Sequence, residues 1–340
     1  MLVTSVGILV ADIIAADLPK VSDPGELIFT GRDIELHIGG HAANVSIDLR
    51  KLGLERGGVS SVGAVGDDIF GEYIESVLER HGVVHHLQRV GGVATSKDLI
   101  LVVRGQDRRY HVDVGANWYL SPDHVFSVLE EEKPAILYVG GVGFMGEFDE
   151  KLPIVLQKAK SIGCLTFVDP VAPYKHGWGI VIPALDWTDV FHCNNLEAAE
   201  ITGEKDSTKA ARILLDEGAK VVIISLGGEG LIASTRDTVF KMPAFKIPVV
   251  DPTGAGDAFC AGVIWGLVRV AYRKRLDITD LSEEELTRIL LEGEAAGAAC
   301  VTMVGTTTGV TEENVEKILK NQGSAVLERL NLESHSLALA

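Results

Sequence analysis

The stretch VVDPTGAGDAFCAG, residues 249–262, decides how the rest of this 340-residue sequence is interpreted. The small residues Gly254, Ala255 and Gly256 follow an apolar run and come directly before Asp257 and a helix-forming segment. Small side chains let consecutive backbone amides converge on an anion, and a helix start adds the positive end of its dipole. An aspartate here is either a helix N-cap or a base that accepts a proton during phosphoryl transfer. Taken alone, the stretch leaves both interpretations open.

The composition indicates a globular α/β protein, because 46% of the residues are hydrophobic and can bury a substantial core. The net charge of −17 argues against nucleic acid or an anionic membrane as the main partner. Four cysteines without a C-x-x-C pair fit a reducing compartment. The N-terminal run lacks the basic region of a signal peptide, and no apolar run is long enough to span a membrane. We therefore expect a cytoplasmic protein.

Apolar runs rich in Val, Ile and Leu alternate with amphipathic helical patterns along most of the chain. This alternation predicts a mostly parallel central sheet between two layers of helices, a three-layer α/β sandwich. Two stretches, at approximately 14–38 and 95–116, instead alternate polar and apolar residues around a turn, and they predict antiparallel strands of a small inserted sheet that acts as a lid. We expect the main domain to span residues 1–330 and residues 331–340 to form a tail.

A second glycine pattern, GVGFMG at residues 141–146, matches the fingerprint of dinucleotide-binding proteins and follows an apolar strand. Asp169, at the end of the next apolar run, could bind the ribose of NAD. The expected helix argues against this interpretation, because Pro153 fits only near a helix start. We therefore expect the helix to begin near residue 150, too far from Gly146 to place a pyrophosphate at its N-terminus. An NAD-binding oxidoreductase remains the alternative.

A polar group of residues lies where the first strand and the first helix are expected. Gly39 and Gly40 would let a ligand approach the backbone, and Asn44 in the first helical turn offers donors and an acceptor to hydroxyl groups. Asp12 follows the first strand, and ligands of open α/β sheets bind at such strand ends. Each residue taken singly is equally consistent with a turn or a solvated loop.

Taken together, these segments resemble the PfkB carbohydrate kinase family, also called ribokinase-like, which includes sugar and nucleoside kinases. The two family signatures match GGHAANVSIDLRKLG (39–53) and DPTGAGDAFCAG (251–262). Four shorter motifs match between them, in the family's order: VGDDIFG (65–71), GANWYLSP (115–122), NNLEAAEITG (194–203) and SLGGEG (225–230). The resemblance implies the ribokinase-like fold and makes Asp257 the catalytic base. It also makes the amides of Gly254, Ala255 and Gly256 the anion hole.

The resemblance implies further ligand contacts. The residues that it places against substrate hydroxyls are Asp12, Gly39, Gly40 and Asn44. The residues that it places near the nucleotide are Asn194, Ser225, Gly227, Gly230 and Glu294. The residues that it places near cations are Glu197 for Mg²⁺, and Asp251 and Thr253 for K⁺ or another monovalent cation, together with carbonyls of CVTMVGTTTG (300–309).

Three departures or alternatives qualify these roles. Asn194 and Glu197 also have the spacing of a helix capping box. Glu294 stands where many relatives have Asn or His, and a carboxylate cannot donate to the ring nitrogens of a base, so the base preference is open. His41 replaces the lysine of the ribokinase-like pattern, which leaves ribose itself open as substrate.

We therefore expect a Mg·ATP-dependent kinase that phosphorylates a primary hydroxyl group of a small sugar, sugar acid or nucleoside, with a sugar favoured over a nucleoside. The resemblance also implies a homodimer formed through the lid. We expect neither nucleic acid nor membrane as a partner. A non-catalytic sugar-sensing protein of the same fold is a further alternative, although the intact Asp257 argues against it.

Overall fold

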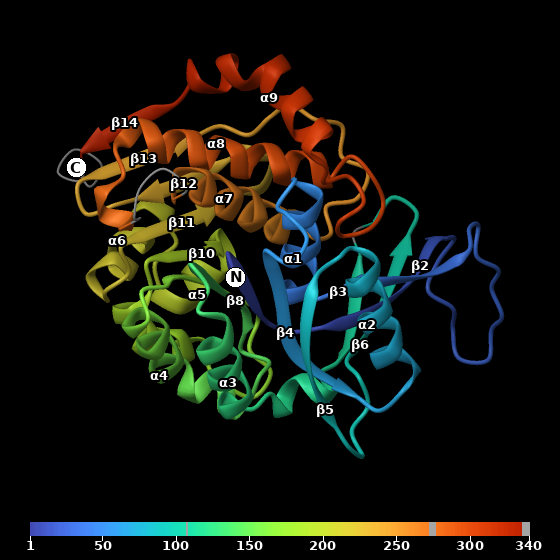
Figure 1. Cartoon of the computed structure of the whole chain (residues 1–340). Helices are drawn as coiled ribbons and strands as arrows, with labels where there is room; N and C mark the ends of the chain where they lie inside the picture. Colours follow the sequence, from blue (N-terminus) through green and yellow to red (C-terminus); the bar gives the residue numbers. More distant parts are fainter. Residues whose placement is uncertain (107, 272–276, 335–340) are drawn as a thin grey trace.

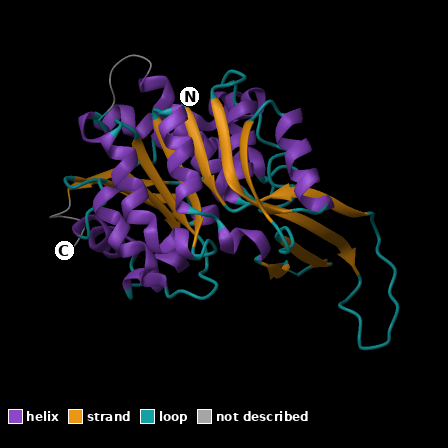
Figure 2. Ribbon diagram, turned by 60° about the horizontal axis from the view of Figure 1, so that its bottom comes forward, coloured by secondary structure: helices purple, strands orange, loops and turns teal. Residues whose placement is uncertain are grey.

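A large sheet runs through the molecule and is covered by helices on both faces (Figures 1 and 2). The structure is a computed structural model that describes residues 1–106, 108–271 and 277–334. The strand order is β14-β13-β12-β11-β10-β9-β8-β1-β4-β5. These strands are β1 (Val3–Gly7), β4 (Val59–Gly66), β5 (Val84–Val90), β8 (Ile136–Val142), β9 (Leu165–Pro170), β10 (Val190–Asn194), β11 (Val221–Ser225), β12 (Leu231–Ser234), β13 (Thr238–Met242) and β14 (Asn331–Ser334).

The strands from β5 to β11 in this order are parallel, whereas β12, β13 and β14 are antiparallel to their neighbours. Parallel strands covered on both faces need apolar or small residues at nearly every position. Strands β1, β4 and β8 are buried at every residue, in agreement with this requirement. The predicted mostly parallel central sheet is confirmed.

Two hydrophobic cores lie on opposite faces of the central sheet. Successive side chains of a strand point to opposite faces, and in β8 Tyr138 belongs to one core and Leu137 to the other. The helices of the first core are α1 (His41–Lys51), α7 (Ala255–Ala271), α8 (Glu283–Cys300) and α9 (Glu312–Leu327). The helices of the second core are α3 (Pro122–Glu132), α4 (Glu147–Ser161), α5 (Asn195–Thr202) and α6 (Ser207–Asp216). Helix α2 (Ile69–Arg80) packs against α1 and β4. None of the helices in the described ranges has an apolar stretch long enough to cross a membrane.

A separate small sheet lies beside the central one, at the right of Figure 1, with the long loop of residues 19–33 extending from it. Its order is β3 (Ile34–Gly39), β2 (Val10–Leu18), β6 (Lys97–Val103) and β7 (Arg109–Asp113). The two predicted stretches do form this sheet, with one difference, because β2 and β6 pair in parallel. Strands β2 and β6 follow β1 and β5, which are themselves parallel, and so both enter the small sheet in the same direction.

Only Ile8 and Leu9 separate β1 from β2, so the small sheet continues directly from the central one. The side chain of Asn117 brackets this junction: its Oδ1 accepts from the amide of Leu9 at 3.0 Å, and its Nδ2 donates to the carbonyl of Leu9 at 3.0 Å. Asp12 is therefore part of β2 in the small sheet. Our expectation that it lies at the end of the first strand is corrected.

The C-terminal end of the described chain contributes to the sheet. Strand β14 pairs antiparallel with β13, and Lys241 donates to Glu333 at 2.8 Å across this pair. The central sheet therefore extends four residues past the expected boundary at residue 330 and into the segment expected to be a tail. Residues 335–340 lie outside the described ranges.

The helix after GVGFMG begins earlier than expected. Helix α4 starts at Glu147 with Gly146 as its N-cap, and Pro153 lies inside the helix instead of in its first turn. The first turn carries the carboxylates of Glu147, Asp149 and Glu150, which stabilise the positive end of the helix dipole. This local preference outweighs the cost of Pro153, so the argument from Pro153 against a dinucleotide site is wrong.

Other features of the turn before α4 argue against pyrophosphate binding at the N-terminus of this helix. The buried carboxylate of Asp149 already accepts from the amide of Met145 at 2.7 Å, and burial raises the pKa of Asp149 to about 6. On the other side, a Cβ atom at Gly146 would lie 2.4 Å from the carbonyl oxygen of Trp118. The helix N-terminus is thus occupied by a side chain of its own first turn and covered by neighbouring backbone. A pyrophosphate at this helix start would have to displace the carboxylate of Asp149.

Candidate active site

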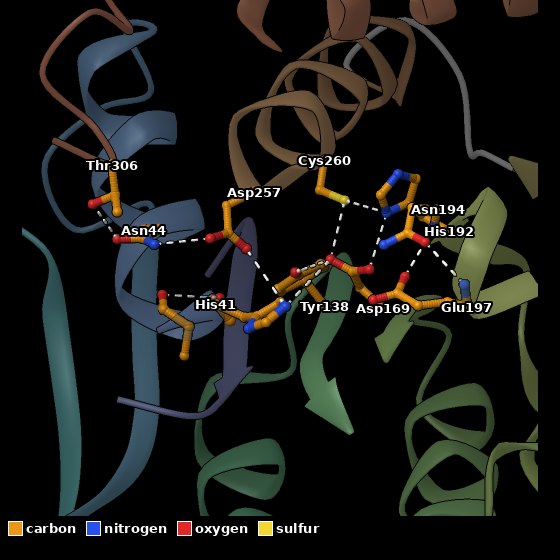
Figure 3. A network of polar contacts seen from close by, with 12 residues as sticks. His41, Asn44, Tyr138, Asp169, His192, Asn194, Glu197, Asp257, Cys260 and Thr306 are labelled. Atoms are coloured by element: carbon orange, nitrogen blue, oxygen red, sulfur yellow. Dashed lines mark hydrogen bonds and ion pairs between the residues drawn. The ribbon is translucent and has the colours of Figure 1, made fainter. Parts of the chain in front are cut away.

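Asp257 lies in the first turn of α7, at the centre of the polar network in Figure 3. Its Oδ2 accepts a hydrogen bond from Nδ2 of Asn44 at 2.8 Å. Its Oδ1 is buried without a hydrogen-bond donor in the described part of the chain, and Nε2 of His41 is 3.8 Å away. Burial raises the pKa of Asp257, an effect that His41 and Asn44 partly offset. One oxygen is therefore held in place, and the other remains to accept a proton.

Asn44 orients this carboxylate. Its Nδ2 binds Asp257, and its Oδ1 accepts from the hydroxyl of Thr306 at 2.9 Å. The two ends of the amide thereby link α1 to α7 and to the loop after α8 (Figure 3). These hydrogen bonds fix the orientation of Asp257. The contact to substrate hydroxyls that the sequence suggested for Asn44 stays a prediction.

The predicted anion loop adopts a backbone conformation that requires glycine at position 254. Gly254 has a φ angle of +78°, and a Cβ atom there would lie 2.6 Å from the carbonyl oxygen of Thr306. The amide of Ala255 donates to the carbonyl of Pro252 at 3.3 Å, whereas the amides of Gly256 and Asp257 have no acceptor within the described ranges. First-turn amides lack helical acceptors and can bind an anion. The amide of Gly254 also has no acceptor within these ranges, so two of the three predicted amides, together with that of Asp257, are available to an anion.

A pocket of about 500 Å³ opens beside this loop. The predicted nucleotide residues Ser225, Gly227, Gly230 and Glu294 all line it, as do Ala255 and Gly256. These residues come from β11 and the turn after it, from α7 and from α8, so the fold brings together segments that are far apart in the sequence. The pocket thus joins four of the five predicted nucleotide residues to the anion loop, whereas Asn194 is not among the residues that line it.

Glu294 is unusual among the residues of this pocket, because it is a buried carboxyl group without a hydrogen-bond partner among the described residues. It projects from α8 and is 9% exposed. Burial raises the pKa of Glu294 to about 8, so the group is mostly protonated at neutral pH. A neutral carboxyl group can donate as well as accept, which removes the restriction that the sequence suggested for a bound base.

Asn194 and Glu197 form a helix capping box, one of the two roles that their spacing in the sequence allowed. The Oδ1 of Asn194 accepts from the amides of Leu196 and Glu197, and Oε2 of Glu197 accepts from the amide of Asn194 at 2.8 Å. Burial raises the pKa of Glu197. Mg²⁺ is usually bound through one or two carboxylates together with phosphates and water. The second oxygen of Glu197 fits this pattern, while the capping box fixes the side chain.

Asp12 and the two glycines before α1 also meet. A Cβ atom at Gly39 would lie 2.1 Å from Oδ2 of Asp12, and one at Gly40, whose φ angle is +88°, would lie 2.4 Å from the carbonyl oxygen of Ile8. Glycine is therefore required at Gly40, whereas a side chain at Gly39 would displace the carboxylate of Asp12. Burial raises the pKa of Asp12 well above its ordinary value, and the charges of Asp98 and Asp257 add to this.

A buried group behind Asp257 was not predicted as part of a kinase site. Asp169 at the end of β9 accepts from the hydroxyl of Tyr138 at 2.9 Å and contacts Nδ1 of His192 at 2.9 Å (Figure 3). Burial opposes both charges, but their mutual attraction prevails, lowering the pKa of Asp169 and raising that of His192. His41 lies between this pair and Asp257, with Nε2 3.9 Å from Asp169 and 3.8 Å from Asp257. Polar residues near the carboxyl ends of parallel strands were the sequence signal for this group.

The two residues predicted for a monovalent cation bind a guanidinium group. Oδ1 of Asp251 accepts from the backbone and side chain of Thr253, at 3.0 and 2.6 Å. Arg108, which directly precedes β7 of the small sheet, donates through Nη1 to Oδ1 of Asp251 at 3.2 Å and to the hydroxyl of Thr253. No pattern in the sequence indicated Arg108, because its contact depends on the position of the small sheet.

Comparisons with known proteins identify the family of this chain. Residues 1–313 match the family described as pfkB family carbohydrate kinase. The chain is 30% identical over 293 residues to the ribokinase of Mus musculus, covering 82% of this chain and 84% of the relative. It is 26% identical over 283 residues to the aminoimidazole riboside kinase of Salmonella typhimurium, covering 80% and 84%. The solved structure of a ribokinase from Giardia lamblia has a TM-score of 0.81 at 21% identity, covering 93% of this chain and 99% of that chain. The structural likeness shows the fold, and the sequence matches extend over the motifs of the site.

Proposed function

Because this chain belongs to the pfkB family of carbohydrate kinases and is a phosphotransferase with an alcohol group as acceptor, we propose that it transfers the terminal phosphate of ATP to the primary hydroxyl group of a small sugar or riboside. The observation that carries this proposal is the pair of oxygens on Asp257. One oxygen is fixed by Asn44, and the other is buried, without a donor in the described residues, beside free amides of the anion loop.

In this proposal Asp257 accepts the proton of the attacking hydroxyl as the phosphoryl group is transferred. Its raised pKa makes it a stronger base than an exposed aspartate. The amides of Gly256 and Asp257 stabilise charge on the transferring phosphoryl group, and they are already oriented by the start of α7. Mg²⁺, held by Glu197 and phosphate oxygens, would neutralise the charge of the nucleotide.

The charges around the acceptor site favour a neutral substrate over a sugar acid. Asp12 and Asp98 are paired in register on neighbouring strands of the small sheet, and both are buried. The pKa of each is raised by burial, and the charge of Asp98 raises that of Asp12 further. An anionic substrate would add another negative charge next to these groups and Asp257. Hydroxyl groups, in contrast, can donate to all three carboxyl groups.

An assay of ADP release over a panel of acceptors tests the proposal. We expect Mg²⁺-dependent turnover with at least one neutral pentose, hexose or riboside, and weaker turnover with the matching sugar acids. Mass spectrometry of the product should place the phosphate on the primary hydroxyl group. Turnover of NADH, or a complete lack of ADP release with every acceptor, would contradict the proposal.

We also propose that two copies of the chain associate through the small sheet. Leu36, Ile13 and Leu99 are aligned in register across β3, β2 and β6, and Leu36 and Leu99 are 41% and 43% exposed. Joining two such faces would bury both. The wild-type protein should have a dimeric mass in light scattering at micromolar concentration.

The double variant Leu36→Glu, Leu99→Glu should be a folded monomer. Ile154→Glu, on the exposed surface of α4, is the matched control and should leave the dimer intact. A monomeric mass of the wild-type protein would rule this assembly out.

Besides ATP and Mg²⁺, we propose that the active centre includes a positively charged group bound to Asp251 and Thr253. The sequence suggested that K⁺ or another monovalent cation provides it, and the contacts of Arg108 suggest a second source. A cytoplasmic location without nucleic-acid or membrane partners stays a prediction.

A further inference from the structure

Arg108 reaches from the small sheet to the start of the anion loop. Its Nη1 donates to Oδ1 of Asp251 and to the hydroxyl of Thr253. The two charged side chains are only 15% and 12% exposed. An ion pair shielded from water in this way is stronger than a surface pair.

The surroundings of Asp251 do not fit an additional metal ion. Oδ1 accepts from Thr253 and Arg108, and Oδ2 accepts from the amide of Gly305 at 3.1 Å. Gly305 belongs to the segment 300–309 that was expected to supply carbonyl ligands, yet here it supplies an N–H donor to the carboxylate. A cation at this place would also meet the positive charge of Arg108.

We propose that Arg108 supplies the positive charge that a bound monovalent cation would otherwise provide, and that this kinase works without K⁺. The proposal rests on the kinase function argued above. Arg108 neutralises Asp251 and holds Thr253, so it stabilises the turn that leads into Gly254. That turn sets the direction of the free amides at the start of α7. Arg108 is thus a positioning residue that acts through the anion loop.

This assignment also links the two sheets. Arg108 directly precedes β7, which lies at the edge of the small sheet, whereas Asp251 and Thr253 precede α7 of the main domain. A cation from solvent would order the anion loop regardless of where the small sheet lies. A guanidinium group attached to the small sheet orders the loop only while that sheet is in the position seen here. The acceptor-binding sheet and the phosphate-binding loop are therefore coupled by one side chain.

The test compares K⁺ with tetramethylammonium at equal ionic strength. For the wild-type protein we expect kcat, the affinity for Mg·ATP in calorimetry, and Tm all to be the same in both salts, within about twofold for the first two. In Arg108→Ala, kcat should fall about tenfold or more in tetramethylammonium, because the loop amides lose their orientation. K⁺ or guanidinium ions added to this variant should restore kcat and raise Tm.

Two further variants make the result specific. Arg109→Ala removes a positive charge from the neighbouring residue, which contacts Gln106 instead of the anion loop, and it should behave as the wild type in both salts. Arg108→Gln serves if the alanine variant does not fold. A wild-type enzyme that loses most of its activity without K⁺ would overturn the proposal, and so would an Arg108→Ala variant that is indifferent to every cation. A failure of the kinase proposal itself looks different, since ADP release would then be lacking in both salts.

Discussion

Replacing Asp257 by asparagine is expected to lower kcat by roughly 10²–10⁴-fold while the protein stays folded. Asparagine has the same shape and can still accept from Nδ2 of Asn44, but it cannot take up the proton of the acceptor hydroxyl. The affinity for Mg·ATP should change little, because the pocket residues and the amides of the loop are untouched. Steady-state kinetics, calorimetry with Mg·ATP and a melting curve measure these three quantities.

The matched control separates catalysis from helix capping. Asp206 is the N-cap of α6 and accepts from the amide of Lys209, so Asp206→Asn makes the same chemical change at a true cap. Asparagine caps a helix about as well as aspartate, and this variant should keep both kcat and Tm. If Asp257→Asn turned over as fast as Asp206→Asn, Asp257 would have a structural role only and the catalytic assignment would be lost.

Glu294→Gln is expected to stabilise the protein by a few kcal/mol at pH 8 and above, and by very little at pH 5. The folded-state pKa of Glu294, about 8, lies above the ordinary value of 4.5. Between pH 4.5 and about pH 8, the carboxyl group of Glu294 loses its proton in the unfolded chain but keeps it in the folded chain. The wild-type protein therefore loses stability across this interval, whereas the glutamine variant does not.

Melting curves of both proteins from pH 5 to pH 9 measure this difference. The gap in Tm should widen up to about pH 8 and then stay constant. Glu284→Gln, at an exposed position in the first turn of the same helix, should give no such trend. A gap that does not change with pH would show that Glu294 titrates normally. A related expectation is that the wild-type affinity for ATP decreases above pH 8, where Glu294 becomes charged.

The sequence predicted the residues of the site better than their hydrogen bonds. The order of the motifs indicated the pfkB family, and the match over residues 1–313 confirms it. Ser225, Gly230 and Glu294 do line one pocket: Ser225 ends a parallel strand, Gly230 lies in the turn after it, and Glu294 projects from α8. The family signatures also located Asp257 and the glycine at position 254, whose backbone angle only glycine adopts easily.

What could not be predicted depends on contacts between distant segments. The amide of Asn44 has two possible orientations and several possible partners, and only the packing of α1 against α7 selects Asp257 and Thr306. Arg108 contacts Asp251 across 143 positions of the chain, through a loop without a recognisable motif. The start of α4 was misjudged for a different reason, since one proline was given more weight than three acidic residues in the first turn.

The hydrogen bonds between Asn117 and Leu9 have a mechanical consequence. Rotation of the backbone at Leu9 would break both bonds in a buried place, at a cost of about 1–3 kcal/mol for each polar group left unpaired. Next to Asn117, the amide of Ala116 donates to the carbonyl of Ala94, just before β6, at 2.9 Å. Both connections into the small sheet are thus clamped to one short helical turn, residues 115–119. The starts of β2 and β6 are thereby held against the main domain, so the small sheet cannot turn about either connection without breaking buried hydrogen bonds.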